Sequence, residues 1–282
     1  MSAGMDPVAL ALAAGASVVF AVANNLQRGA AATVPVEAGG PFRLLLRLAG
    51  TPRWLLGSTL ALAALALHAV ALGRGGVILV QSVLASGLVV ALGLEALHER
   101  RALRWREVTG ACVLVAGVIL VLAVGRPAGG RPIGLGVQAV TFAVLLLMVA
   151  AGLANSSGRR HRDRAAVVMA AAAGGCFAVD ALFLKGVSNW LDDLDALPAL
   201  TCMVGFVVAS FLGNLLVQRA YQWAPLRVAL PAVTAADPLV AFVIGRVVLG
   251  ETLRSGASAV AAVIVGLIGI AVGIVLTTTS TA

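Results

Sequence analysis

The chain alternates long apolar runs with short polar segments. Nine runs are each about the 20 residues that a helix needs to cross a bilayer, and they cover residues 8–26, 54–73, 75–97, 106–124, 133–153, 165–185, 198–218, 226–249 and 257–277. Strands of membrane barrels are shorter and alternate apolar and polar positions. The pattern therefore predicts an all-α polytopic membrane protein with nine transmembrane helices.

Four of these runs, in residues 8–124, recur in residues 165–277. Phe20-Ala21-Val22, followed by Arg28-Gly29, returns as Phe177-Ala178-Val179, followed by Lys185-Gly186. The stretch from Glu99 to Gly117 returns in the same way as Glu251 to Gly269. Four spans bring the chain back to its starting side, so the ninth span between the copies inserts the second copy upside down.

This pattern predicts three units. They are a first repeat at 1–124, a linker helix with a cytoplasmic hinge at 125–164, and a second, inverted repeat at 165–282. Inverted repeats are the architecture of secondary transporters, which place a site near the bilayer midplane between the two copies. A transporter that works by alternating access is the leading interpretation.

Composition agrees with a membrane protein, since 61% of residues are hydrophobic, 11% are charged and the mean hydropathy is +1.03. The net charge of +8 does not indicate nucleic-acid binding, because the basic residues fall in loops between spans. On the side opposite the N-terminus lie 14 of the 20: Arg28, Arg43, Arg47, Arg53, Arg100, Arg101, Arg104, Arg106, Arg159, Arg160, Arg162, Arg164, Arg219 and Arg227.

Basic loops face the cytoplasm, so we expect the N-terminus outside and the C-terminus inside the bacterial cytoplasmic membrane. Within the first basic loop, Phe42 to Leu48 is amphipathic and is suited either to the membrane surface or to a simple connector. The first span lacks a preceding positive region, so we expect it to stay in the protein and not to be cleaved as a signal peptide.

The end of each repeat carries a motif. Glu99-Arg100-Arg101 precedes the glycines of the fourth span, and Gly250-Glu251-Thr252-Leu253 precedes those of the ninth. These motifs resemble the signature of the drug/metabolite transporter superfamily (EamA-like). The segment FAVANNLQRGA of the first span and the external N-terminus resemble a bacterial branch related to NIPA-type magnesium transporter-like proteins. Each repeat also resembles the small multidrug resistance unit, in which the fourth helix joins two units.

That multidrug unit has a membrane glutamate in its first helix, which this chain lacks. Two other acids lie inside spans, Asp180 in the outer half of the sixth and Asp237 near the centre of the eighth. A charged residue at mid-bilayer costs roughly 2.5 to 3.5 kcal/mol on insertion scales. The sequence therefore predicts a substrate or proton site at these acids, the alternative being buried partners for arginine or backbone.

Two prolines flank the second acid in sequence. Pro231 and Pro238 each remove a helical N–H and free the carbonyl four residues earlier, those of Arg227 and Thr234. We expect the eighth span to be kinked or partly unwound there, with free backbone oxygens beside Asp237. The remaining candidate site residues, each with helix–helix packing as its alternative role, are Asn24, Asn25, Gln81, Phe20 and Phe177.

Glycines of the fourth and ninth spans, including Gly117 and Gly269, predict a close seam between these two helices. The seam would be a static scaffold, with the other spans of each repeat moving. Glu95 lies one turn before Glu99 at the cytoplasmic end of the third span, where we expect interfacial pairing with arginines.

The sequence favours proton-coupled transport of a small metabolite or organic cation. A divalent cation (Mg²⁺) carrier, a lipid-linked substrate flippase and a non-transporting scaffold stay open as alternatives. An enzyme is not expected, because the chain lacks the HExxH and nucleophile-elbow motifs. No cofactor is expected either. Substrate, direction, coupling ion, any metal and the oligomeric state, a homodimer included, are left undetermined.

Overall fold

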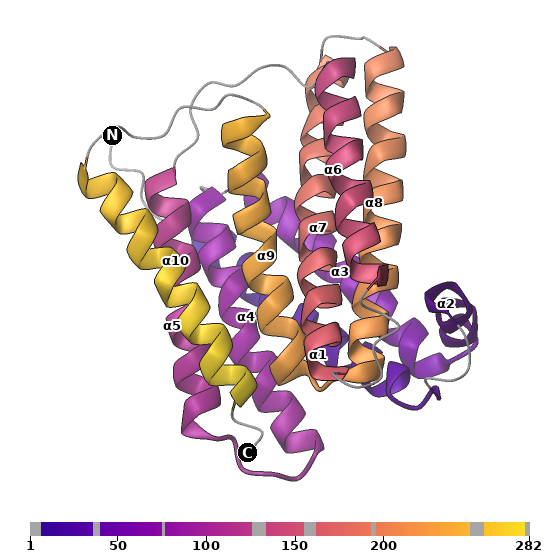
Figure 1. Cartoon of the computed structure of the whole chain (residues 1–282), viewed down its shortest axis with the longest axis vertical. Helices are drawn as coiled ribbons and strands as arrows, with labels where there is room; N and C mark the ends of the chain where they lie inside the picture. Colours follow the sequence, from indigo (N-terminus) through magenta and orange to yellow (C-terminus); the bar gives the residue numbers. More distant parts are fainter. Residues whose placement is uncertain are drawn as a thin grey trace.

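A computed structural model describes residues 7–35, 40–74, 77–125, 134–154, 162–192, 196–248 and 257–279. This part of the chain forms ten helices (Figure 1): α1 (Pro7–Ala31), α2 (Pro41–Ala49), α3 (Pro52–Arg74), α4 (Val77–His98), α5 (Trp105–Gly125), α6 (Leu135–Ala154), α7 (Arg162–Asp192), α8 (Ala196–Trp223), α9 (Leu226–Val247) and α10 (Ala257–Thr278).

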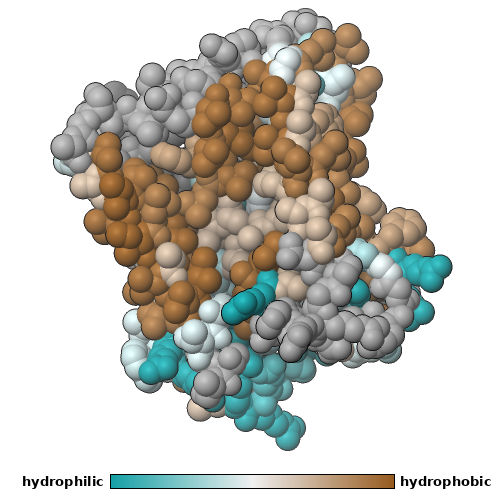
Figure 2. All heavy atoms as spheres, viewed as in Figure 1, coloured by the Kyte–Doolittle hydropathy of each residue, from teal (hydrophilic) through white to brown (hydrophobic). Residues whose placement is uncertain are grey.

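Seven of these helices are long and apolar enough to cross a membrane, namely α1, α3, α6, α7, α8, α9 and α10. A shorter apolar stretch, Val83–His98, lies within α4. Large apolar side chains such as Leu62, Leu147 and Val265 are exposed on the outside. Figure 2 shows a wide apolar band on one face of the molecule. The predicted class, an all-α polytopic membrane protein, is confirmed at this level.

The helices pack in a definite order. α1 lies against α3 and α4, and α7 lies against α8 and α9, while α6 packs on α7 and α8. In Figure 1, α6, α7 and α8 stand side by side on the right, α5 and α10 on the left, and α9 between them.

The predicted glycine seam joins α5 to α10. A Cβ atom at Gly117 would lie 2.6 Å from the carbonyl oxygen of Gly266, and one at Gly110 would lie 2.9 Å from that of Gly273. The pairing runs in opposite directions along the two helices, so they are antiparallel. Gly269 is the looser member, since a Cβ there would meet its nearest atoms only at 3.5 Å.

Two helices differ from the sequence expectation. α7 extends to Asp192, beyond the predicted end at residue 185, so part of the expected outer loop is helical. α9 runs without interruption from Leu226 to Val247 with Pro231 and Pro238 inside it. The prediction of a partly unwound segment in this span is therefore wrong, because the helix continues past both prolines.

The short helix α2 has three distinct faces. Leu44 and Leu48 form a buried face, and Phe42 and Leu46 form an exposed apolar face, at 57% and 62% exposure. Arg43 and Arg47 form the third, basic face. A basic helix with an exposed apolar face is typical of the membrane interface. It lies toward the end of the molecule where hydrophilic side chains gather (Figures 1 and 2).

Candidate functional site

The two membrane acids come together between α7, α8 and α9. Asp180 of α7 and Asp237 of α9 are both half-buried, and their carboxyl groups are close enough to interact electrostatically. Ser210 of α8 donates a hydrogen bond of 2.8 Å to Oδ2 of Asp180. The structure thus brings together two acids that lie 57 positions apart in the chain, and adds a hydroxyl group.

Close packing fixes the distance between α7 and α9 beside this pair. A Cβ atom at Gly174 would lie 2.5 Å from the carbonyl oxygen of Val233 and 3.0 Å from Cβ of Ala236. Only glycine allows this approach. Ala236, one of the two residues that Gly174 contacts, directly precedes Asp237.

A cavity of about 80 Å³ lies between α1, α4 and α9. Its wall includes Ser17, Phe20 and Asn24 from α1, and Thr234 from α9. Thr234 is the residue whose carbonyl lacks a helical donor, because residue 238 is proline. The lining comes from both predicted repeats and combines the polar side chains of Ser17, Asn24 and Thr234 with apolar ones.

The other predicted site residues lie outside the cavity lining or outside the described side chains. Asn25 donates hydrogen bonds of 3.0 Å to the carbonyls of Ala21 and Ala91, so its amide ties α1 to α4. Phe177 lies over Gly213 of α8 and is not part of the described cavity lining. Gln81 belongs to α4, but its side chain is outside the part of the structure that is described.

A chain of amides joins α1 to α8 and so links the two halves. Gln218 donates to Gln27 at 2.8 Å and to Asn214 at 3.2 Å, and Tyr221 donates to Asn24 at 3.1 Å. Buried amide pairs of this kind hold membrane helices together. Asn24 therefore both lines the cavity and contacts the opposite half.

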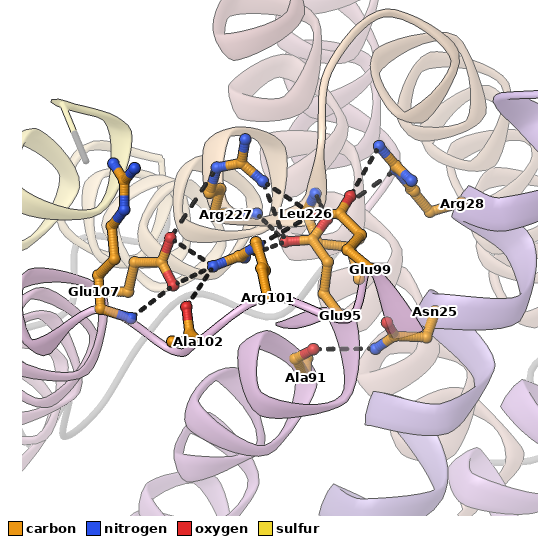
Figure 3. A network of polar contacts seen from close by, with 11 residues as sticks. Asn25, Arg28, Ala91, Glu95, Glu99, Arg101, Ala102, Glu107, Leu226 and Arg227 are labelled. Atoms are coloured by element: carbon orange, nitrogen blue, oxygen red, sulfur yellow. Dashed lines mark hydrogen bonds and ion pairs between the residues drawn. The ribbon is translucent and has the colours of Figure 1, made fainter. Parts of the chain in front are cut away.

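Six charged side chains form a second cluster, shown in Figure 3, which we call the ion-pair cluster: Arg28, Glu95, Glu99, Arg101, Glu107 and Arg227. Glu95 and Glu107 are only 2% and 1% exposed. Three acids and three arginines balance, as buried charges require.

Glu95 binds the start of α9 directly. Its two oxygens accept hydrogen bonds from the backbone N–H groups of Leu226, at 2.5 Å, and Arg227, at 3.1 Å. The first N–H groups of a helix have no partner within the helix, and the helix dipole favours a negative charge there. A side chain of α4 thereby caps α9, which lies 131 residues later.

Arg101 is the hub of the cluster. It contacts Glu107 at 2.8 Å, Glu99 at 2.9 Å and Glu95 at 3.5 Å. Burial alone would lower the pKa of this guanidinium, but the hydrogen bonds to Glu107 and Glu99 and the nearby acids raise the pKa above its ordinary value. Arg101 is therefore a permanent cation.

The turn after α4 places Arg101 there. Arg100 has a positive φ of 52°, its N–H bonds to the carbonyl of Leu97, and the N–H of Arg101 bonds to that of Ala96. These are the bonds of a Schellman motif, with arginine at the left-handed position where glycine is usual. The turn directs the chain back over the end of α4.

The sequence identified the acids but not their hydroxyl partner, and it expected only interfacial pairing at Glu95. Serine is common in membrane helices, so Ser210 carries no signal of its own. The close spacing of Glu95, Glu99, Arg101 and Glu107 was the available signal for the ion-pair cluster. Within the described residues, no group of three or more His, Cys, Asp or Glu side chains is placed to hold a metal ion.

Comparison with known proteins gives one informative similarity. The chain is 28% identical over 216 residues to an uncharacterized protein of Corynebacterium glutamicum, a match that covers 74% of this chain and 73% of that protein. No protein-family model matches the chain. No solved structure matches it either. The similarity covers most of both chains but carries no function.

Proposed function

We propose that the protein is a secondary transporter that moves a small metabolite or organic cation by alternating access, coupled to protons. The observation that carries this proposal is the pair Asp180 and Asp237 between three helices, with Ser210 donating a hydrogen bond to Asp180. Acids inside a membrane span are costly and mark ion or proton pathways by default. Two such acids that interact electrostatically favour a used site over a packing role.

The order of helix packing supports an inverted-repeat arrangement with nine spans. α1 packs on α3 and α4 as α7 packs on α8 and α9, with α5 and α10 as the fourth helix of each set. Antiparallel crossing of α5 and α10 is what inversion of one copy requires. We therefore infer units at 1–124 and 165–282 around the linker helix α6, as in the drug/metabolite transporter superfamily that the sequence resembles.

The site would lie where these halves meet. The cavity is walled by α1 and α4 of the first unit and by α9 of the second, which also carries Asp237. Substrate would bind beside Asn24, Phe20 and Thr234, and protons would bind at the two acids. Binding or release of a proton at Asp237 would then act on α9, the helix that also forms part of the cavity wall.

The gathering of basic residues at one end supports an orientation in the bacterial cytoplasmic membrane with the N-terminus outside. The end of α4, the start of α5 and the start of α9 lie together in the ion-pair cluster, and the positive-inside rule assigns that end to the cytoplasm.

A divalent cation carrier is the second candidate, favoured by the same carboxyl pair and the Ser210 hydroxyl. Mg²⁺ usually keeps several waters and takes one or two protein carboxylates. A flippase or a scaffold would not need two interacting acids inside the membrane.

A ligand screen tests the proposal. Purified protein is heated with amines, amino acids, nucleosides, sugars and Mg²⁺, and a ligand that binds the folded state raises the Tm. We expect stabilisation by one of these classes that disappears in Asp237→Asn. Stabilisation that survives loss of both acids would place the binding elsewhere, and no stabilisation by any class would favour the scaffold.

A further inference from the structure

Three members of the ion-pair cluster lie beyond the cavity on the three helices that form its wall. Arg28 follows the cavity residue Asn24 by four residues, and Glu95 follows Leu88 by seven. Arg227 precedes Leu230 by three. At about 1.5 Å per residue, these spacings put the charges roughly 5 to 10 Å from the lining along each helix axis.

The cluster also connects parts that alternating access would separate. Arg28 belongs to α1, Glu95 to α4 and Arg227 to α9, and Glu99 follows the end of α4, so the ion pairs cross from the first half of the chain to the second. Glu95 additionally holds the first two N–H groups of α9. Any movement of α9 away from α4 breaks these bonds together.

The remaining contacts anchor the cluster to the glycine seam. Arg101 lies in the turn before α5 and Glu107 lies in the first turn of α5, which packs against α10. Glu107 also accepts a hydrogen bond from the backbone N–H of Arg104, which fixes the first turn of α5. α1, α4 and α9 are thus tied at one point to the helix pair expected to stay still.

Ion pairs suit a contact that must open as well as close. The three arginines are partly exposed, so water can solvate them when they separate. A buried ion pair adds little net stability compared with an apolar contact of the same size, which allows both states to be populated. A plug of packed apolar side chains would favour the closed state more strongly.

We propose that the ion-pair cluster is the cytoplasmic gate of the cavity, and that the structure has this gate closed. The inference rests on the proposed function for its purpose, but closure itself is a property that can be measured without a substrate. When α9 moves, the Glu95 cap and the Arg227 contacts release, and the cavity between α1, α4 and α9 opens to the basic end.

The test uses a cysteine in the cavity wall. Thr234→Cys is introduced into a chain whose Cys112, Cys176 and Cys202 are replaced by alanine, and inside-out vesicles are treated with a membrane-impermeant maleimide. With the cluster intact we expect slow labelling. Arg227→Gln should raise the rate at least fivefold, whereas Arg227→Lys, which keeps the charge, should stay within twofold.

The matched control is Arg106→Gln, an exposed arginine of the same end that stacks on Trp105. It should not change the rate, because Arg106 forms no ion pair with the three acids of the cluster among the described residues. A second opening variant, Glu99→Gln, guards against misfolding of the first, since it removes a different partner.

Fast labelling of the chain with an intact cluster would overturn the proposal, and so would unchanged labelling in folded Arg227→Gln and Glu99→Gln. Failure of the transporter proposal looks different. In that case no ligand stabilises the protein, while the labelling rates still follow the charges of the cluster.

Discussion

At the residue scale, the carboxyl groups of Asp180 and Asp237 are the main unfavourable elements of the membrane interior. Ser210 offsets part of the cost at Asp180 with one hydrogen bond. Asp237 has no side-chain hydrogen bond to any of the residues that the structure describes, and its charge acts on Asp180. A residue selected only for packing at position 237 would not need a charge.

Replacing Asp237 by asparagine should therefore leave the protein folded, with a Tm equal to or above that of the wild type, because the amide keeps the shape and removes a charge from the membrane. Proton-coupled transport should fall by roughly two orders of magnitude or more, about 2.7 kcal/mol or more in activation free energy. Asp180→Asn should weaken transport and shift its pH optimum, since the pair binds protons jointly. Normal transport together with early melting in Asp237→Asn would identify a packing residue instead.

At the element scale, the sequence predicted long apolar helices because each apolar run is close to the length that a bilayer imposes, and among the described residues seven of the nine predicted spans form helices long and apolar enough to cross. It also predicted the contact of α5 with α10, since two glycines on α5 and three on α10 allow the close approach of membrane helices. It failed on α9, where two prolines were taken to break a helix that is in fact continuous. The Glu95 cap could not be predicted, because its partners are backbone groups 131 residues away.

The seam gives a prediction about folding. Gly117→Leu should destabilise the protein by about 1 to 3 kcal/mol or more through overpacking, because even a Cβ meets the backbone of α10 there. The matched control is Gly136→Leu, at an exposed helical position with no atom within 4 Å of a built Cβ. Thermal melting of both purified variants measures the difference. Equal Tm values would show that α5 and α10 do not depend on close backbone contact.

At the scale of the whole molecule, the asymmetry of charge and the packing order support one orientation. The turn between α4 and α5 lies at the basic end of the molecule. α8 begins at the opposite end, because its last residue, Trp223, lies close to the start of α9 at the basic end. Cysteines at Ala102 and Leu197 should therefore react with an impermeant reagent from opposite sides of the membrane, Ala102 from the cytoplasm. Reaction of both from the same side would contradict the inverted repeat.

The most direct test of the transporter proposal is proton movement in proteoliposomes. Purified protein is reconstituted with an internal pH dye, a pH gradient is imposed in either direction, and amines, polar metabolites and Mg²⁺ are added in turn. The account predicts that one class of compound collapses the gradient at a rate that saturates with its concentration, and that Asp237→Asn abolishes this while Arg106→Gln does not. Gradients that every compound leaves unchanged, with wild-type protein folded and inserted, would contradict it.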